Sequence, residues 1–179
     1  MSWIAGVRRV PSPNCDDRPP GTAVTLLVLH SISLPRGKYG KDAGGGAIER
    51  LFTNRLDPAE HSSFADLAGL RVSAHFLIRR GGEPIQFVPV GARAWHAGTS
   101  CWRGRERCND YSVGIELEGT DDSKFADAQY EALSVLVGEL RQLLPLRAVA
   151  GHSDVAPGRK SDPGARFDWV RILGLLAHY

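Results

Sequence analysis

The run Thr25-Leu-Leu-Val-Leu-His30 has the length of a β-strand, and the four residues between its ends are leucine or valine. A continuous apolar run of this length is typical of a strand that is covered on both faces. A loop rich in glycine and proline follows at 33–47, and such residues mark the end of a regular element. The pattern predicts a buried strand that carries His30 at its carboxyl end.

Other segments also have strand character. Residues 75–79 and 84–90 flank a Gly81-Gly82 turn signal, which predicts a hairpin. Residues 94–97 look short and extended. Residues 147–152 return to strand character and end on a histidine. Two strands are therefore expected to end on a histidine.

Residues 111–118 alternate between apolar and polar side chains. This period of two predicts a strand and places Glu116 and Glu118 on the same face. That face is predicted to be polar, and the opposite, apolar face is made by Val113, Ile115 and Leu117.

Apolar residues recur at steps of three and four after residue 127, at Tyr130, Leu133, Leu136, Val137, Leu140, Leu143 and Leu144. This spacing predicts an amphipathic helix that Pro145 ends. Weaker helical signals lie at 47–52 and 64–68, and a closing amphipathic helix is expected at 167–176. Because helices and strands are mixed without a strict β–α–β order, we expect an α/β (α+β) sandwich around a central mixed sheet, as one domain over 1–179.

The composition excludes several classes of protein. The 179 residues include 22 basic and 20 acidic side chains, and the arginines are scattered, so a nucleic-acid partner is not expected. No apolar run approaches the roughly 18 residues of a membrane-spanning helix, and the first residues lack the pattern of a secretory signal. We expect a cytoplasmic protein without a membrane partner. Its cysteines are odd in number and lack a CxxC motif, which favours reduced thiols at Cys15, Cys101 and Cys108.

Two histidines and one aspartate form a candidate metal site. His30 and His152 both lie at predicted strand ends, where α/β folds usually place their sites. Asp162 follows ten residues after His152, in a loop stiffened by prolines. Two imidazoles and one carboxylate suit a hydrolytic zinc ion with an open fourth position. From the residues alone, the alternative remains that the histidines only end their strands and Asp162 only forms a turn.

A set of motifs runs in order along nearly the whole chain: Leu26-Leu-Val-Leu-His30-Ser-Ile-Ser-Leu-Pro35, Arg71-Val-Ser-Ala-His75, Arg93-Ala-Trp-His-Ala-Gly98, Gly104-Arg-Glu-Arg-Cys-Asn-Asp110, Gly114-Ile-Glu-Leu-Glu-Gly119, Gly151-His152 and Arg159-Lys-Ser-Asp-Pro-Gly164. Together they resemble the N-acetylmuramoyl-L-alanine amidase and peptidoglycan recognition protein-like family, and within it the cytoplasmic zinc amidases of bacterial cell-wall recycling. The combination is far more specific than any single motif.

The resemblance implies a mixed sheet flanked by helices, with Zn²⁺ bound by His30, His152 and Asp162. It also implies that Glu116, the first glutamate of Gly-Ile-Glu-Leu-Glu, is the general base, and that Lys160 stabilises the transition state. Spacing alone does not separate Glu116 from Glu118, because both lie on one face of the strand.

Substrate contacts are also implied by the resemblance. It assigns Trp95 to packing against sugar or peptide, and Arg71 and Arg107 to polar or carboxylate contacts. It also assigns a substrate contact to Ser31, at the position directly after the first ligand where the family commonly has asparagine. A hydroxyl reaches less far than an amide, which puts a substrate contact at that position in doubt.

The function implied is zinc-dependent hydrolysis of the amide between anhydro-N-acetylmuramic acid and L-alanine of muropeptides. We expect a monomer whose partner is this small-molecule substrate. One alternative is a peptidoglycan-binding domain without catalysis, and another is an amidase that acts on intact cell wall. His75 and His96 lie near extended segments, where they could line the cleft, and neither is assigned to the metal.

Overall fold

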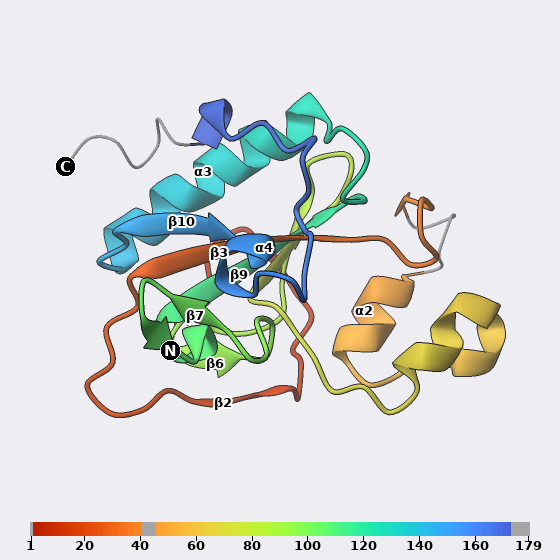
Figure 1. Cartoon of the computed structure of the whole chain (residues 1–179), viewed down its shortest axis with the longest axis horizontal. Coiled ribbons are helices and arrows are strands. Elements are labelled where there is room, and N and C mark those ends of the chain that lie inside the picture. Colours follow the sequence, from red (N-terminus) through yellow and green to blue (C-terminus); the bar gives the residue numbers. More distant parts are fainter. Residues whose placement is uncertain (1, 41–45, 173–179) are drawn as a thin grey trace.

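A computed structural model describes residues 2–40 and 46–172 of the chain. Its centre is a six-stranded sheet with the order β1-β5-β4-β9-β3-β10 (Figure 1). β4 and β5 are antiparallel and the other neighbours are parallel, so the sheet is mixed, as predicted. The strands are β1 (Arg8–Arg9), β3 (Leu26–Ile32), β4 (Phe76–Ile78), β5 (Pro84–Gln86), β9 (Ser112–Glu118) and β10 (Ala148–Gly151).

Shorter elements surround this sheet. Two small antiparallel sheets pair β2 (Cys15–Asp17) with β6 (Ala92–Ala94), and β7 (Cys101–Trp102) with β8 (Arg105–Glu106). The predicted extended segment at 94–97 is therefore a strand only up to Ala94, since the chain leaves the pairing there. The helices are α2 (Ala47–Phe52), α3 (Asp127–Leu143), α4 (His152–Val155) and three 3-10 helices at Pro58–Glu60, Ser62–Leu67 and Cys108–Tyr111.

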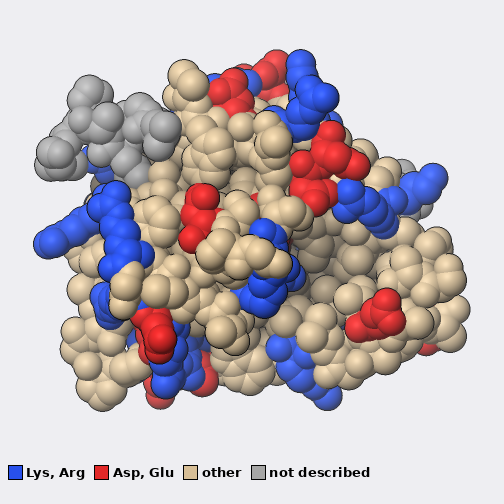
Figure 2. All heavy atoms as spheres, viewed as in Figure 1, with Lys and Arg blue, Asp and Glu red and all other residues tan. Residues whose placement is uncertain are grey.

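The helix α2 and the first two 3-10 helices form a lobe at one side of the molecule (Figure 1). Figure 2 shows a recess between this lobe and the rest of the molecule. Basic and acidic side chains are interspersed on the face shown there, and neither sign forms one continuous patch. The recess is where the carboxyl ends of the central strands meet the lobe.

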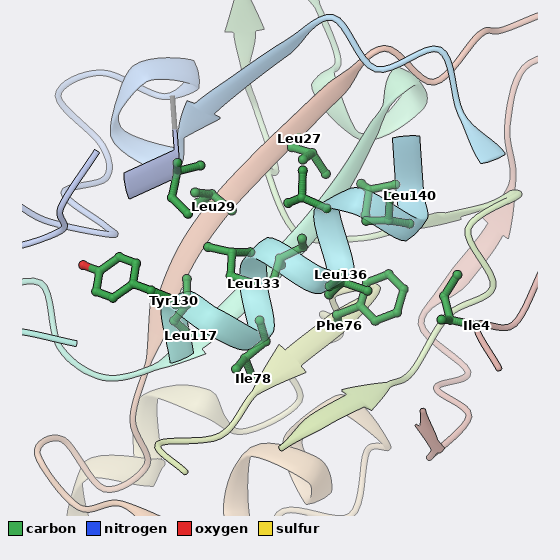
Figure 3. Packing of buried hydrophobic residues seen from close by; sticks show 14 of the residues in the cluster. Ile4, Leu27, Leu29, Phe76, Ile78, Leu117, Tyr130, Leu133, Leu136 and Leu140 are labelled. Atoms are coloured by element: carbon green, nitrogen blue, oxygen red, sulfur yellow. The ribbon is translucent and has the colours of Figure 1, made fainter. Parts of the chain in front are cut away.

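The helix α3 covers one face of the sheet (Figure 3). Its buried hydrophobic residues are Tyr130, Leu133, Leu136, Val137 and Leu140, at the predicted spacing. They pack on the strand residues Leu27, Leu29, Phe76, Ile78, Val113, Ile115 and Leu117. A fully buried leucine or valine contributes about 1.5–3 kcal/mol, so this seam anchors the helix. Leu143, at the end of α3, is 52% exposed and lies outside the seam.

The polar face predicted for β9 is present, and it is buried like the apolar face. All seven residues of β9 are buried. The alternation is present, since Val113, Ile115 and Leu117 face α3. However, the sequence pattern does not reveal that the lobe and loops cover the opposite face, where Glu116 and Glu118 lie.

The register of the sheet brings the candidate residues together. β3 pairs with β9 so that His30 lies beside Glu116. β10 pairs Gly151 with Leu29, so the next residue, His152, comes to lie beside His30. His30 is not the last residue of its strand, because β3 continues to Ile32.

The end of the chain differs in part from its prediction. Residues 167–169 are not helical, residues 170–172 are, and the rest of the predicted closing helix lies outside the described residues. The weak helical signal at 47–52 is confirmed as α2, and that at 64–68 falls largely within a 3-10 helix. Within residues 2–40 and 46–172, no helix has the length and apolar character to cross a bilayer.

Candidate metal centre

Three ligand atoms converge at the carboxyl ends of β3 and β10. The Nδ1 atoms of His30 and His152 are 2.9 Å apart. The Oδ2 atom of Asp162 lies 3.2 Å from His30 Nδ1 and 3.1 Å from His152 Nδ1. Ligands at zinc distances on a tetrahedron are separated by about 3.3 Å. The three atoms therefore already have the spacing of one face of a tetrahedral zinc site, so these residues fit the metal.

Asp162 reaches this position because its loop is fixed at several points. Ser153 N donates to Asp162 O at 2.9 Å, and Ser161 Oγ donates to Asp121 Oδ2 at 2.6 Å. Gly164 has a φ of +92°, and a Cβ there would lie 1.8 Å from the carbonyl oxygen of Asp121. Only glycine allows this close approach, so the loop can fold back over the strand ends.

The electrostatics favour the metal-binding forms of His30 and Asp162. Burial lowers the pKa of His30 to about 4, which keeps its imidazole neutral at physiological pH. Burial alone would raise the pKa of Asp162, but hydrogen bonds with His152 and His30 outweigh it and lower that pKa below its ordinary value. A neutral imidazole and an ionised carboxylate are the forms that bind a cation.

Glu116 lies next to the ligands with one oxygen unpaired. The residue is 9% exposed, and its Oε2 has no hydrogen-bond partner among the described residues. Burial raises the pKa of Glu116 well above its ordinary value, the nearby Asp162 carboxylate raises it further, and Lys160 partly offsets this. A buried, unpaired carboxyl with a raised pKa beside a metal-capable cluster is suited to accept a proton.

Lys160 lines the same cavity as Glu116 and the three ligands. Its side chain is exposed, and within the described part of the chain no hydrogen bond or ion pair holds its ammonium. It is nevertheless close enough to lower the pKa of Glu116. The charge is therefore available to a bound molecule.

The cavity has two chemically different walls. Its volume is about 240 Å³. The polar wall contains the three candidate ligands, Glu116 and Lys160. The lobe supplies half of the residues of an apolar wall made of Leu34, Leu51, Phe52, Leu67, Leu70 and Val72. An elongated molecule with polar and apolar groups would contact both walls.

Of the four residues assigned to substrate, only Ser31 lines this cavity. Trp95 donates from Nε1 to Asp16 Oδ1 at 3.2 Å. Arg107 pairs with Asp110 at 3.1 Å and lines a separate cavity of about 620 Å³. Arg71 is exposed and lies between Leu70 and Val72 of the apolar wall. These four assignments remain predictions.

Two contributors were missed at the sequence level. One is the apolar wall, whose members are scattered between residues 34 and 72. The other is His96, whose Nδ1 lies 2.9 Å from His30 Nε2. The sequence predicts both His75 and His96 near the cleft without a role, and in the structure His75 does not line the cavity. The signal for His96 is its position within the short extended segment at 94–97.

Comparison with known proteins gives consistent matches. The family described as N-acetylmuramoyl-L-alanine amidase matches residues 20–165. The chain is 52% identical to the 1,6-anhydro-N-acetylmuramyl-L-alanine amidase AmpD of Escherichia coli K12, over 99% of this chain and 96% of that protein. A crystal structure of a selenomethionine derivative of AmpD superposes with a TM-score of 0.92 at 52% identity, covering 97% of this chain and 96% of the other.

A more distant structure contains a ligand. It is the complex of the amidase AmiD from Escherichia coli with the substrate anhydro-N-acetylmuramic acid-L-Ala-D-γ-Glu-L-Lys. The TM-score is 0.61 and the identity 30%, covering 88% of this chain and 60% of that chain.

Proposed function

The chain belongs to the N-acetylmuramoyl-L-alanine amidase family, and we propose that it is a zinc enzyme that hydrolyses the amide between anhydro-N-acetylmuramic acid and L-alanine of muropeptides. One observation carries the proposal: three converging ligand atoms, Glu116 and Lys160 all line one cavity. A metal-dependent amide hydrolysis uses a metal ion with an open position, a base that accepts the proton of the attacking water, and a cation near the developing negative charge.

His30, His152 and Asp162 would hold the zinc ion and leave its fourth position open. A zinc ion there supplies Lewis-acid chemistry: it lowers the pKa of water to about 7 and polarises the carbonyl that is attacked. The buried positions of both histidines keep the ligands fixed. The chain itself must then move the proton and balance the charge.

Glu116 is the general base in this proposal. Its unpaired Oε2 is available for the proton that the attacking water loses, and the raised pKa keeps that proton from being lost at once. The same carboxyl can then give the proton to the nitrogen of the leaving L-alanine. Lys160, with no competing ion pair, offsets the negative charge that develops on the former carbonyl oxygen.

We extend the proposal to substrate and setting. Ser31, Arg71, Trp95 and Arg107 contact the sugar or the stem peptide. The ligand of the AmiD complex, an anhydro-sugar with a short peptide, supports a soluble muropeptide as the substrate class. In this proposal the enzyme acts as a single-domain monomer in the cytoplasmic recycling of wall fragments.

The test combines metal analysis with mass spectrometry of a muropeptide. Purified protein should contain one zinc per chain and convert anhydro-N-acetylmuramyl tripeptide to an anhydro-sugar acid and a free peptide. The double variant His30→Ala/His152→Ala should lose both zinc and turnover, while His61→Ala, which changes an exposed histidine outside the cavity, should lose neither.

Three results would contradict the proposal. Stoichiometric zinc in the double variant would refute the ligand set. Muropeptide binding without cleavage by the zinc-loaded protein would make the chain a binding domain instead. Cleavage of intact cell wall at a rate equal to or faster than that of the muropeptide would identify the wall itself, rather than recycled fragments, as the substrate.

A further inference from the structure

His96 lies directly behind the first metal ligand. It follows β6, and its ring is buried at 9% exposure. Its Nδ1 is 2.9 Å from His30 Nε2, and its Nε2 is 3.1 Å from Ser112 Oγ. The His30 and His96 rings meet edge to face, with centroids 5.0 Å apart. His96 is too far back to be a ligand, because its nitrogens face His30 and Ser112 rather than Asp162.

The hydrogen bonds fix which nitrogen of each ring carries a proton. His30 Nδ1 faces His152 and Asp162, so its lone pair must lie there when it binds a cation. A neutral imidazole has one proton, which then sits on His30 Nε2 and is donated to His96 Nδ1. The proton of His96 therefore lies on Nε2 and is donated to Ser112 Oγ.

The sequence makes room for this arrangement on β9. A Cβ at Gly114 would lie 2.5 Å from Cγ of His96. Any larger residue at position 114 would push the His96 ring away from its place against the strand. The backbone beside the ring is held too, because the N–H groups of His96 and Ala97 both donate to Asn109 Oδ1, at 3.3 and 2.8 Å.

The second metal histidine is oriented from the same segment. His152 Nε2 lies 3.3 Å from the carbonyl oxygen of Ala97. Arg159 also donates to that oxygen, at 2.6 Å. Residues 96 and 97 thus face both metal histidines, one through a side chain and the other through the backbone.

We propose that His96 is a positioning residue that fixes the orientation and tautomer of His30 toward the metal, with Ser112 fixing His96 in turn. The inference rests on the proposed zinc site, since it assigns His30 Nδ1 to the ion. Partners that orient a metal-binding histidine typically change metal affinity or activity by about 10- to 100-fold when they are lost.

The experiment measures zinc affinity by competition with a chelating dye, together with the unfolding temperature of the metal-free protein and kcat for a muropeptide. His96→Phe keeps a ring of similar size but removes the acceptor, so zinc should bind about 10- to 100-fold more weakly. His96→Asn keeps an acceptor near the position of Nδ1 and should restore most of the affinity. Ser112→Ala, a small change at a buried site, should weaken binding a few-fold and covers the case in which His96→Phe does not fold.

The matched control is His75→Phe. His75 is buried too, and its ring lies 5.9 Å from that of His96. However, its Nδ1 accepts from Gly114 N, and no hydrogen bond or ring contact joins it to His30 or His152 among the described residues. The His75→Phe variant should have a lower unfolding temperature than wild type. Its zinc affinity should stay within about threefold of wild type, which is less than the change expected when an orienting partner is lost.

Two outcomes would overturn the inference while leaving the proposed function intact. The first is wild-type zinc affinity in folded His96→Phe, or in Ser112→Ala if the former does not fold. The second is an equal loss in His75→Phe, which would reduce the effect to packing. Absence of zinc from the wild-type protein would instead overturn the proposed function and this inference together.

Discussion

Glu116 and Glu118 lie two residues apart on the same face of β9, and both are buried, at 9% and 1% exposure. Their surroundings are opposite. Glu118 accepts hydrogen bonds from Gly40 N, Arg80 N and the Arg79 guanidinium, each at 2.9 Å. Glu116 Oε2 has no partner in the described part of the chain, and the residue faces the metal ligands.

The difference separates a carboxylate that holds the fold from one that is available for chemistry. Arg79 joins Glu118 to Glu49, which also binds Arg8, so the Glu118 cluster ties β9 to α2 and β1. Buried polar groups are normally satisfied in this way. A buried polar group without a hydrogen-bond partner that lines a cavity instead indicates a binding or catalytic site.

The largest effect is expected at Glu116. Glu116→Gln keeps the shape of the side chain but cannot accept the proton, so kcat should fall by on the order of 10² to 10⁴. Because Glu116 is not in the ligand set, the variant should keep its zinc. Steady-state kinetics with muropeptide and zinc analysis of the same preparation measure both.

Either of two results would contradict the different roles assigned to Glu116 and Glu118. If Glu116→Gln loses its metal, the residue is part of the binding site rather than the base. If Glu118→Gln is the inactive variant at full zinc content, the two roles are exchanged.

The next effect is expected in stability. Glu118→Gln removes the charge that faces Arg79 and turns one acceptor into a donor that faces N–H groups. The free energy of unfolding should fall by about 1.5–3 kcal/mol, the range for hydrogen bonds to charged groups. Urea unfolding measures it. Glu139→Gln, at an exposed position on α3, should change it by less than about 0.5 kcal/mol.

That prediction also has a kinetic side. The folded fraction of Glu118→Gln should retain kcat within a few-fold of wild type, because Glu118 does not line the cavity. A variant as stable as wild type, or one that is folded but inactive, would remove the structural role assigned to the Glu118 cluster.

A smaller effect of opposite sign is expected for Glu116 in the metal-free protein. Burial raises the pKa of Glu116 in the folded state above that of the unfolded chain, so folding favours the protonated carboxyl. Its ionisation therefore destabilises the fold increasingly as pH rises above the ordinary pKa near 4.5. Glu116→Gln removes this penalty and should stabilise the metal-free protein at pH 7 by on the order of 1 kcal/mol, the scale for one unpaired buried polar group.

The stabilisation of Glu116→Gln relative to wild type should shrink toward zero near pH 4, where the wild-type carboxyl is largely protonated in both the folded and the unfolded state. Urea unfolding of chelator-treated wild type and variant at both pH values gives the difference directly. The other buried ionisable groups are the same in both proteins, so their contributions cancel in the difference between the two free energies of unfolding. A loss of stability at pH 7 that does not vary with pH would mean that Glu116 is held by a partner, as Glu118 is.

The sequence predicted the elements that place the three candidate metal ligands, because those elements have strong local patterns. The apolar run before His30, the spacing of α3 and the strand that leads to His152 are confirmed as β3, α3 and β10. Strand ends in a parallel pair meet at one edge of a sheet, so the convergence of His30 and His152 followed. The proline-bearing loop then brought Asp162 to both.

The distinction between Glu116 and Glu118 could not be derived from residue spacing. Alternation assigns a face to each residue but not what packs against that face. Glu118 finds Arg79 at a sequence separation of 39 residues, and no local pattern links such positions. The family resemblance selected Glu116, and the partners of the two carboxylates supply a physical reason for that choice.

The smallest effect is expected for substitution of the cysteines, which form no hydrogen bond with Glu116 or Glu118 among the described residues. Cys15 is half-buried, Cys101 exposed and Cys108 buried, and none of them lines the cavity of the metal ligands. All three are free thiols, and Cys108 Sγ lies 3.3 Å from Tyr111 Oη, a contact that serine can also make. A triple Cys→Ser variant should therefore keep its zinc and a kcat within about twofold of wild type, since substitutions away from a site rarely change more. Circular dichroism establishes that the variant is folded before its kinetics are compared. Loss of turnover in a folded, zinc-loaded triple variant would show that a thiol takes part in the chemistry. Proton transfer would then depend on a cysteine as well as on Glu116.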